Sequence, residues 1–288
     1  MANPLTDDSA VDGDKTDGDK IVRRLVAGAA NPVLVADFQA FSSAPRLSHL
    51  ISGRTEGRPI YQVDPLDALS QDRPYISVAD LAAEAAEAFA RSQPADGPVC
   101  VIGYCSAAAL STRIATLLGR SREATAVLLR PSWPDTAAIE ATFATLAANL
   151  GARHLQCPDL DDDPDHCVRR MEELLRAELV TLATSQGLDG SADTFGELLL
   201  TYRSWLAFLL ACRNDSLASG NTTVGNTPVA NTPVANTRVT ALTEAPDGFT
   251  VPGLSPGEFK VSQLPVADGD NPVTPEVVEL LLAQIMGS

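Results

Sequence analysis

One cysteine stands where a buried strand is expected to turn sharply into a helix. Residues 99–109 read V-C-V-I-G-Y-C-S-A-A-A, so an apolar run stops at Gly103 and a run of small residues suited to a helix begins after Cys105. Small residues two places before and two places after a turn residue let strand and helix approach closely, which pushes the turn side chain outward. Here that side chain is a thiol, which can act as a nucleophile in acyl transfer. Cys105 is therefore a candidate nucleophile, the alternative being a small buried residue that closes a strand.

The elements around this turn alternate between strands and helices. Helical patterns are expected at 43–51, 77–93 and 106–118, and strand patterns at 31–37, 58–64, 98–102 and 124–129. The helix that begins after Ser77 is the clearest, because S-V-A-D is a capping-box-like start with Asp80 in place of the usual Glu. Strands that alternate with helices predict a mostly parallel sheet covered on both faces. The predicted fold class is therefore α/β.

The second half of the chain changes character. Residues 136–150 are Ala-rich and helical, and residues 153–158 are compatible with one more short strand. Long amphipathic helical patterns follow at 166–182 and 194–211, with no strand between them. Such an insertion is typical of a helical lid over the mouth of an α/β sheet. Strand patterns resume at 238–244 and 259–264, and a last helix begins at Thr274, with Pro275 in its first turn.

These patterns divide the chain into a core with an insertion and a tail. The Asp-rich tail, with Gly and Ser between the charges, is expected to be disordered. Four copies of an N-T-P-V-A-like pentapeptide cannot form a solenoid core, so this repeat is expected to be an exposed linker. The predicted segments are the tail (1–24), the first part of the α/β core (25–150), the helical lid (151–216), the repeat linker (217–237) and the last strands and helix of the core (238–288).

Composition restricts the partners and the compartment. The 288 residues include 37 Asp and Glu against 21 Lys and Arg, a formal charge of −16, which argues against nucleic acid and anionic membranes because phosphate contacts need clustered cations. No stretch is long and apolar enough to cross a bilayer, and residues 1–10 lack the features of a signal peptide. Five cysteines without framework spacing fit a reducing compartment, so we expect a cytoplasmic protein.

The order of these parts resembles the thioesterase-type α/β hydrolases of polyketide and nonribosomal peptide assembly lines. The resemblance spans about residues 32–285 and rests on P-V-L-V-A-D-F-Q-A, R-P-I-Y-Q-V-D, S-V-A-D-L-A-A, the G-Y-C-S-A turn, the lid, and the last strand and helix. It implies an α/β-hydrolase fold and a nucleophile that takes an acyl group from a small-molecule thioester on the phosphopantetheine arm of an acyl or peptidyl carrier protein. No cofactor is implied beyond the partner's arm. Relatives with Cys at the turn are acyl or aminoacyl shuttles and cyclases that release tetramic acids or pyridones.

The resemblance also implies an acid after the next strand and a His after the last strand, and this chain differs at both places. None of its three histidines follows the last strand, where Asp270 and Asn271 stand as a polar substitute for the base or as an ordinary turn. Arg130 follows the strand at 124–129, and the nearest carboxylate is Asp135, either an orienting acid or a helix N-cap. A serine without a base would be nearly inert, whereas a thiol is partly ionised near neutrality. Cysteine is thus a way to work without the His.

The remaining candidates would complete an acyl site. The backbone N–H of Ser106 is expected to bind an oxyanion together with that of Phe38 or Gln39, in the loop after the first strand. Four aromatic side chains either line an acyl pocket under the lid or pack in the core: Tyr104, Trp133, Trp205 and Phe208. The spacing H-x2-C-x8-H-C matches no common zinc site, so no metal is expected at His154, Cys157, His166 and Cys167.

Two functions therefore remain open. An acyl-thioester enzyme would use Cys105 to attack a carrier-bound thioester and pass the acyl group to water, to another carrier thiol or to an internal nucleophile. A catalytically degenerate relative would keep the fold and bind a carrier protein or an acyl product without turnover.

Overall fold

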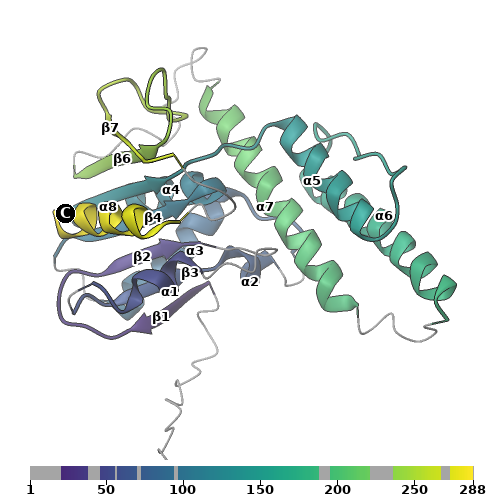
Figure 1. The fold of residues 1–288 in the computed structure, drawn as a ribbon, viewed down its shortest axis with the longest axis horizontal. Coiled ribbons are helices and arrows are strands. Elements are labelled where there is room, and N and C mark those ends of the chain that lie inside the picture. Colours follow the sequence, from purple (N-terminus) through teal and green to yellow (C-terminus); the bar gives the residue numbers. More distant parts are fainter. Residues whose placement is uncertain are drawn as a thin grey trace, which may run out of the picture.

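Seven strands of the described chain form one sheet, with β1 at one edge and β7 at the other (Figure 1). The sheet order is β1-β3-β2-β4-β5-β6-β7. β1 runs antiparallel to β3, and every other described pair of neighbours is parallel, which confirms the predicted α/β class with a mostly parallel sheet. The strands are β1 (Val22–Val26), β2 (Val33–Ala36), β3 (Ile60–Val63), β4 (Val99–Tyr104), β5 (Ala124–Leu129), β6 (Thr237–Thr243) and β7 (Phe259–Gln263).

The computed structural model describes residues 21–37, 46–55, 57–69, 73–93, 97–187, 195–220, 236–266 and 273–287. The acidic tail up to residue 20 and the repeat from 221 to 235 lie outside these ranges. So do four of the predicted site residues, whose roles stay predictions: Phe38, Gln39, Asp270 and Asn271.

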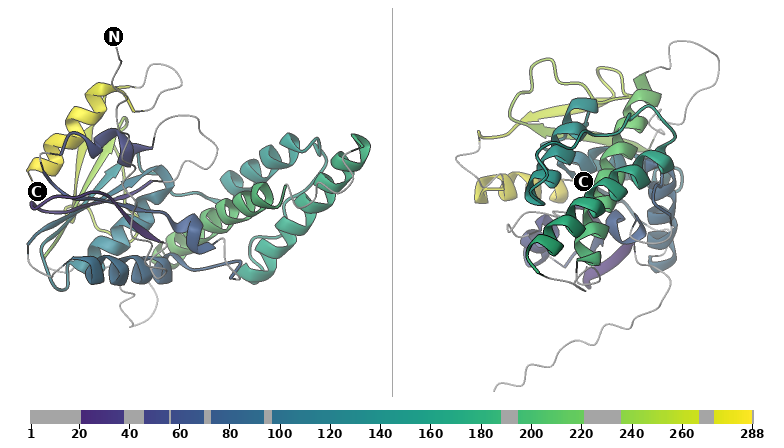
Figure 2. Two further views of the ribbon diagram at one scale, coloured as in Figure 1. Left: turned by 90° about the horizontal axis from the view of Figure 1, so that it is seen from below. Right: turned by 90° about the vertical axis from the view of Figure 1, so that its right-hand side faces the viewer.

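Helices cover both faces of the sheet (Figure 2). α3 (Val78–Ser92) and α4 (Ala108–Leu118) lie on one face, and α1 (Leu47–Ser52) and α8 (Pro275–Met286) lie on the other. Each face of the sheet has its own hydrophobic core. Successive residues of β4 point to opposite faces, so Val101 packs with α3 and α4 and Ile102 packs with α1 and α8. Both side chains are fully buried, as expected for a parallel strand between two helical layers.

The sequence patterns predicted most of these elements but missed β1 and the short helix at Pro65–Leu69. The α3 cap is confirmed, since the Ser77 hydroxyl accepts a hydrogen bond from the backbone N–H of Asp80 at 3.1 Å. Residues 22–24, which the sequence assigned to the disordered tail, belong to β1. Residues 153–158 contain no strand, because Cys157 lies against Met171 of a helix, 4.0 Å between the sulfur atoms, and the described sheet has no edge there to supply ladder hydrogen bonds.

Three helices form an arm that projects from one end of the sheet (Figures 1 and 2). α5 (Thr136–Asn149), α6 (Pro164–Ser185) and α7 (Gly196–Gly220) pack on one another. We call them the helical arm. α7 also contacts α2 (Pro65–Leu69), α3 and α4, so it joins the arm to the core. The helical insertion thus begins at α5, which the sequence boundary at residue 150 had assigned to the core, and it continues past residue 216.

Two arginines with little exposed surface, Arg113 and Arg213, hold α7 in this position. Arg113 of α4 donates from Nε and Nη2 to the Asp215 carboxylate of α7, at 3.1 and 2.6 Å. Arg213 of α7 donates to the Thr136 hydroxyl and to the carbonyl of Leu160, both at 3.0 Å. These charges interrupt the apolar surface of α7, and within the described ranges no helix combines the length and apolarity needed to cross a membrane.

Candidate active site

Chemically capable side chains gather where the strands end. Asp37 follows β2, Asp64 follows β3, Cys105 follows β4, Arg130 follows β5 and Glu244 follows β6. These strands are parallel neighbours, so their carboxyl ends meet at one edge of the sheet. Ligands of open α/β sheets bind outside this edge, so it is the place to look for a site.

Cys105 occupies the sharp turn that the sequence predicted. It has φ +53°, in the left-handed region that residues other than glycine rarely adopt. The turn continues as a short 3₁₀ helix, η1 (Cys105–Ala107), directly into α4. Two backbone N–H groups hold the Cys105 carbonyl, from Ala108 and, at 3.2 Å, from Ser132. Cys105 is exposed, so the strained backbone presents this candidate nucleophile to solvent.

Gly103 makes this turn possible. A Cβ on residue 103 would lie 2.6 Å from Ser111 Oγ, 2.8 Å from Ser111 Cβ and 2.9 Å from the carbonyl oxygen of Ala107. The Ser111 hydroxyl itself donates to the carbonyl of Ile102 at 3.1 Å, which ties α4 to β4. The small residue that the sequence analysis required before the turn is therefore a steric necessity.

A buried thiol lies behind the turn. Cys212 of α7 donates from its thiol to the carbonyl of Ser106, at 3.4 Å between sulfur and oxygen. Burial raises the pKa of Cys212 well above the usual thiol value, and the nearby charges of Asp215 and Cys105 add to this. The Ser106 hydroxyl lies 3.9 Å from the Cys105 sulfur and is itself mostly buried. α7 thus contacts the segment that contains Ser106, whose N–H is one of the two expected oxyanion donors.

An ion pair stands beside the turn, at the position where the resemblance implies an acid. Arg130 has φ +47°, and its backbone N–H donates to the carbonyl of Leu242 at 2.8 Å. Its Nη1 pairs with the carboxylate of Glu244. Burial raises the pKa of Tyr104, the charge of Cys105 raises it further, and the charge of Arg130 lowers it. The sequence analysis missed Glu244; its only signal was a carboxylate at the end of a predicted strand.

The other predicted acid acts as a helix cap in the structure. Asp135 is exposed, and its carboxylate accepts a hydrogen bond from the backbone N–H of Ala138 at 2.8 Å, in the first turn of α5. Histidines lie elsewhere: His49 is exposed on α1, His154 is 3.6 Å from the Glu178 carboxylate, and His166 is exposed in the first turn of α6. Within the described residues no histidine hydrogen-bonds to the Cys105 thiol.

The residues that suggested a metal do not converge. His154 is exposed beside Glu178, and Cys167 is buried in the core. Burial raises the pKa of Cys157 to about 12 and that of Cys167 to about 11, which disfavours the thiolates a metal would need. Over the described ranges, no three His, Cys, Asp or Glu side chains form a group that could hold an ion.

The predicted pocket aromatics are involved in packing. Phe208 is fully buried and stacks with Trp205, 6.2 Å between ring centroids. Trp133 lies 5.7 Å from Phe249, and the crevice beside it, about 10 Å³, is too small for a ligand. Tyr104 is half-buried beside Cys105. Of the four, only Tyr104 is placed directly next to the candidate nucleophile.

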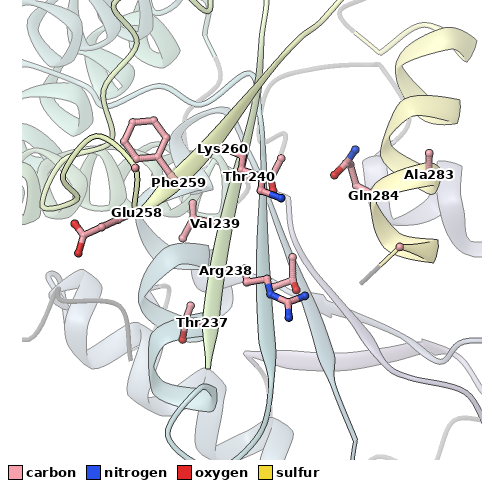
Figure 3. A pocket seen from close by; sticks show the side chains of 12 residues that line it. Thr237, Arg238, Val239, Thr240, Glu258, Phe259, Lys260, Ala283 and Gln284 are labelled. Atoms are coloured by element: carbon pink, nitrogen blue, oxygen red, sulfur yellow. The ribbon is translucent and has the colours of Figure 1, made fainter. Parts of the chain in front are cut away.

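A larger hollow of about 430 Å³ lies at the other end of the sheet (Figure 3). Its lining includes Thr125 and Arg238, near the beginnings of β5 and β6, whereas Cys105 follows the end of β4. Figure 3 shows Gln284 of α8 on the side of this helix that faces the strands. The hollow is therefore not the space in front of the nucleophile.

Asp37 is a buried carboxylate one strand away from the turn. Ala36 pairs with Gly103 across the sheet, and the Asp37 side chain has no exposed surface. Its Oδ2 accepts the backbone N–H of Ser48 at 2.7 Å, while Oδ1 has no hydrogen-bond partner in the described part of the chain. Burial raises the pKa of Asp37 to about 6, against the opposing effects of the Ser48 hydrogen bonds and the charge of Arg46.

No family model and no curated protein matches the sequence, but solved structures match the fold. The holo-AB3403 structure, a four-domain nonribosomal peptide synthetase bound to AMP and glycine, has a TM-score of 0.50 at 16% identity over 93% of this chain and 20% of that chain. The NocB thioesterase domain with a fluorophosphonate nocardicin G analog has 0.49 at 17% identity, over 93% and 100% of the two chains. A putative alpha/beta hydrolase family protein from Desulfitobacterium hafniense has 0.49 at 14% identity, over 92% and 98%.

These likenesses, at low identity, concern the fold. The first match is to a small part of a much longer protein, since this chain spans 20% of the synthetase. The match at a TM-score of 0.50 agrees with the α/β class that the mostly parallel sheet and its covering helices establish.

Gly103→Ala tests the close approach of β4 and α4. The added methyl has no space, so we expect a loss of about 1–3 kcal/mol in the free energy of unfolding. Urea unfolding followed by circular dichroism measures it. Gly53→Ala is the matched control, because no described atom lies within 4 Å of its Cβ, and its effect should stay within about 0.5 kcal/mol. Equal stabilities of the two variants would contradict the steric argument.

Thiol labelling tests the exposure of the five cysteines. N-ethylmaleimide should modify native protein at Cys105 alone at pH 8, because Cys100, Cys167 and Cys212 are buried. Cys157 should stay unmodified too, since a pKa of about 12 leaves only about one thiol in 10⁴ ionised at that pH. Peptide mass spectrometry identifies the adducts. Cys105→Ala should abolish native labelling, and protein unfolded in urea should label at every cysteine.

Asp37→Asn tests the buried carboxylate. The folded pKa of about 6 lies above the usual 3.8, so the folded state binds the proton more tightly and the wild-type free energy of unfolding should fall as pH rises from 4 to 6. The variant should lack this fall and be more stable at pH 7 by up to about 3 kcal/mol. Asp247→Asn, at an exposed turn, is the control. Identical pH profiles for Asp37→Asn and wild type would contradict the assigned pKa.

Proposed function

We propose that the chain is an acyl-thioester enzyme that uses Cys105 on substrates tethered to a carrier protein. The observation that carries this proposal is an exposed thiol on a left-handed strand-to-helix turn, at the carboxyl edge of an α/β-hydrolase-like sheet. A side chain held this way is available to an incoming carbonyl carbon without a rearrangement of the backbone. Solved structures with a similar fold support this proposal, since one is the NocB thioesterase domain and another the nonribosomal peptide synthetase AB3403.

The reaction follows from the residues at the turn. The Cys105 sulfur attacks the thioester carbonyl, and the developing oxyanion accepts hydrogen bonds from the Ser106 N–H and from an N–H of Phe38 or Gln39. The bond from the carbonyl to the pantetheine sulfur then breaks, the new acyl–sulfur bond to Cys105 remains, and the thiol proton ends on the departing sulfur. Water, a second carrier thiol or a nucleophile within the acyl chain next takes the acyl group and restores the free thiol.

A thiol suits this exchange better than a hydroxyl would. Transfer of an acyl group between two thiols conserves one thioester bond, so the first step needs no large driving force. A thiolate also needs no base to deprotonate it at the moment of attack, which fits a turn without a histidine in hydrogen-bond contact among the described residues. The partner's phosphopantetheine arm supplies the leaving group, the protein needs no cofactor of its own, and the cytoplasm is the compartment we propose.

A second function is supported by one specific observation. Arg130 occupies the position that the family resemblance gives to the acid, and it is paired with Glu244 rather than aimed at a histidine. A relative that has lost the acid could keep the fold and bind a carrier protein or acyl product without turnover. The two functions differ in whether Cys105 becomes acylated.

Incubation with acyl-pantetheine thioesters distinguishes them. Intact-mass and peptide mass spectrometry should find an acyl adduct on Cys105, absent from Cys105→Ala and retained in the control Cys157→Ala. Turnover should be slow, because the general base that a family triad supplies is worth about 10²- to 10⁴-fold in rate. The absence of an adduct with every donor, together with carrier-protein binding, would establish the degenerate function instead.

A further inference from the structure

We propose that Arg130 holds the carboxylate of an acidic acyl group next to Cys105, an inference that rests on the proposed acyl-thioester function. The substrate class is then an acyl chain with a free carboxylate close to its thioester. The elements of the site are the Arg130 guanidinium, its partner Glu244 and the half-buried Tyr104, from the ends of three neighbouring strands.

Backbone contacts on both sides place Arg130 beside the nucleophile. Leu129, just before it, pairs with Tyr104 across the sheet. Ser132, two residues after it, donates its backbone N–H to the Cys105 carbonyl at 3.2 Å. The segment that contains Arg130 therefore lies alongside the turn that contains Cys105. The backbone of Arg130 is anchored on its far side too, through its N–H to the carbonyl of Leu242.

One edge of the Arg130 guanidinium is paired with a carboxylate, and the other edge has no hydrogen-bond partner among the described residues. Nη1 pairs with Glu244, which fixes the orientation of the side chain. Nε and Nη2 are buried and have no hydrogen-bond partner in the described part of the chain. These two nitrogens form the parallel fork with which arginine binds a carboxylate through two hydrogen bonds. Buried donors without an acceptor are unfavourable, so this edge points to a partner that is brought by the substrate.

The charges of the protein favour a carboxylate as the group that binds the free edge of Arg130. The chain carries a net −16, so an acidic substrate needs a fixed cation to offset repulsion. The thiol and this cation also act on the same side chain, because the charge of Cys105 raises the pKa of Tyr104 and the charge of Arg130 lowers it. The phosphate of a pantetheine arm lies at the opposite end of the arm from the thioester. The anion that reaches Arg130 while the carbonyl is at Cys105 is therefore the acyl group's own carboxylate.

Alkylation of Cys105 tests the subsite without acyl transfer. Iodoacetate and iodoacetamide react alike, with a sulfur–carbon bond formed and iodide released, and differ in the carboxylate. The ratio of their rate constants at Cys105, followed by mass spectrometry, should be about 10-fold lower in Arg130→Gln than in wild type, while the iodoacetamide rate changes little. Arg238→Gln, which removes an exposed arginine paired with Glu123, should leave the ratio unchanged.

Acyl donors test the same subsite in the proposed reaction. Succinyl-pantetheine should acylate wild-type Cys105 faster than its amide analogue, succinamoyl-pantetheine, and Arg130→Gln should remove the preference. A lowered alkylation ratio with no acylation by either donor would leave the anion subsite standing and overturn the enzyme function. An unchanged ratio would make Arg130–Glu244 a structural ion pair and overturn this inference. Should Arg130→Gln fail to fold, Arg130→Lys, which keeps the charge but lacks the fork, must lower the ratio.

Discussion

There is no room for a side chain at position 103, and the candidate site depends on this. Strand β4 and helix α4 touch there, with Ser111 filling the space in which a Cβ would stand and its hydroxyl bonded to the preceding carbonyl. The chain must therefore reverse from strand to helix within a few residues, which forces Cys105 to φ +53°. Backbone packing, rather than a bond to its sulfur, positions this candidate nucleophile. The turn can then carry a thiol in place of a hydroxyl without a change in geometry.

Charges at the carboxyl edge of the sheet are arranged in pairs rather than as a proton relay. Arg46 binds Asp64 at 2.7 Å after β3, and Arg130 binds Glu244 across the ends of β5 and β6. Asp37 is the exception, since burial raises its pKa to about 6 with one oxygen unpaired among the described residues. A paired carboxylate is a weak base, so this edge offers electrostatic binding more readily than proton abstraction. A thiol, the nucleophile that we propose, suits such an environment because it is partly ionised without a base.

The sequence predicted those features that depend on neighbours along the chain. Gly103 and Cys105 lie two residues apart, and the Ser77 cap of α3 spans three residues, so spacing alone was informative. β1 was missed because V-R-R-L-V shows no apolar run: it is an edge strand with Arg23 and Arg24 exposed. The pairing of Arg130 with Glu244 joins residues 114 positions apart and depends on which strands are neighbours. No local pattern contains that information, and the Asp135 cap shows how a plausible acid can serve only its own helix.

Helix α7 links the two halves of the molecule in a way that the lid hypothesis did not anticipate. Its 25 residues reach about 37 Å, from the helical arm to the underside of the turn. Near its carboxyl end, the Cys212 thiol binds the Ser106 carbonyl and Asp215 binds Arg113 of α4. These contacts tie the helical arm to α4 and to the segment that contains Ser106. The same helix that carries the insertion therefore also contacts the turn that bears the proposed nucleophile, Cys105.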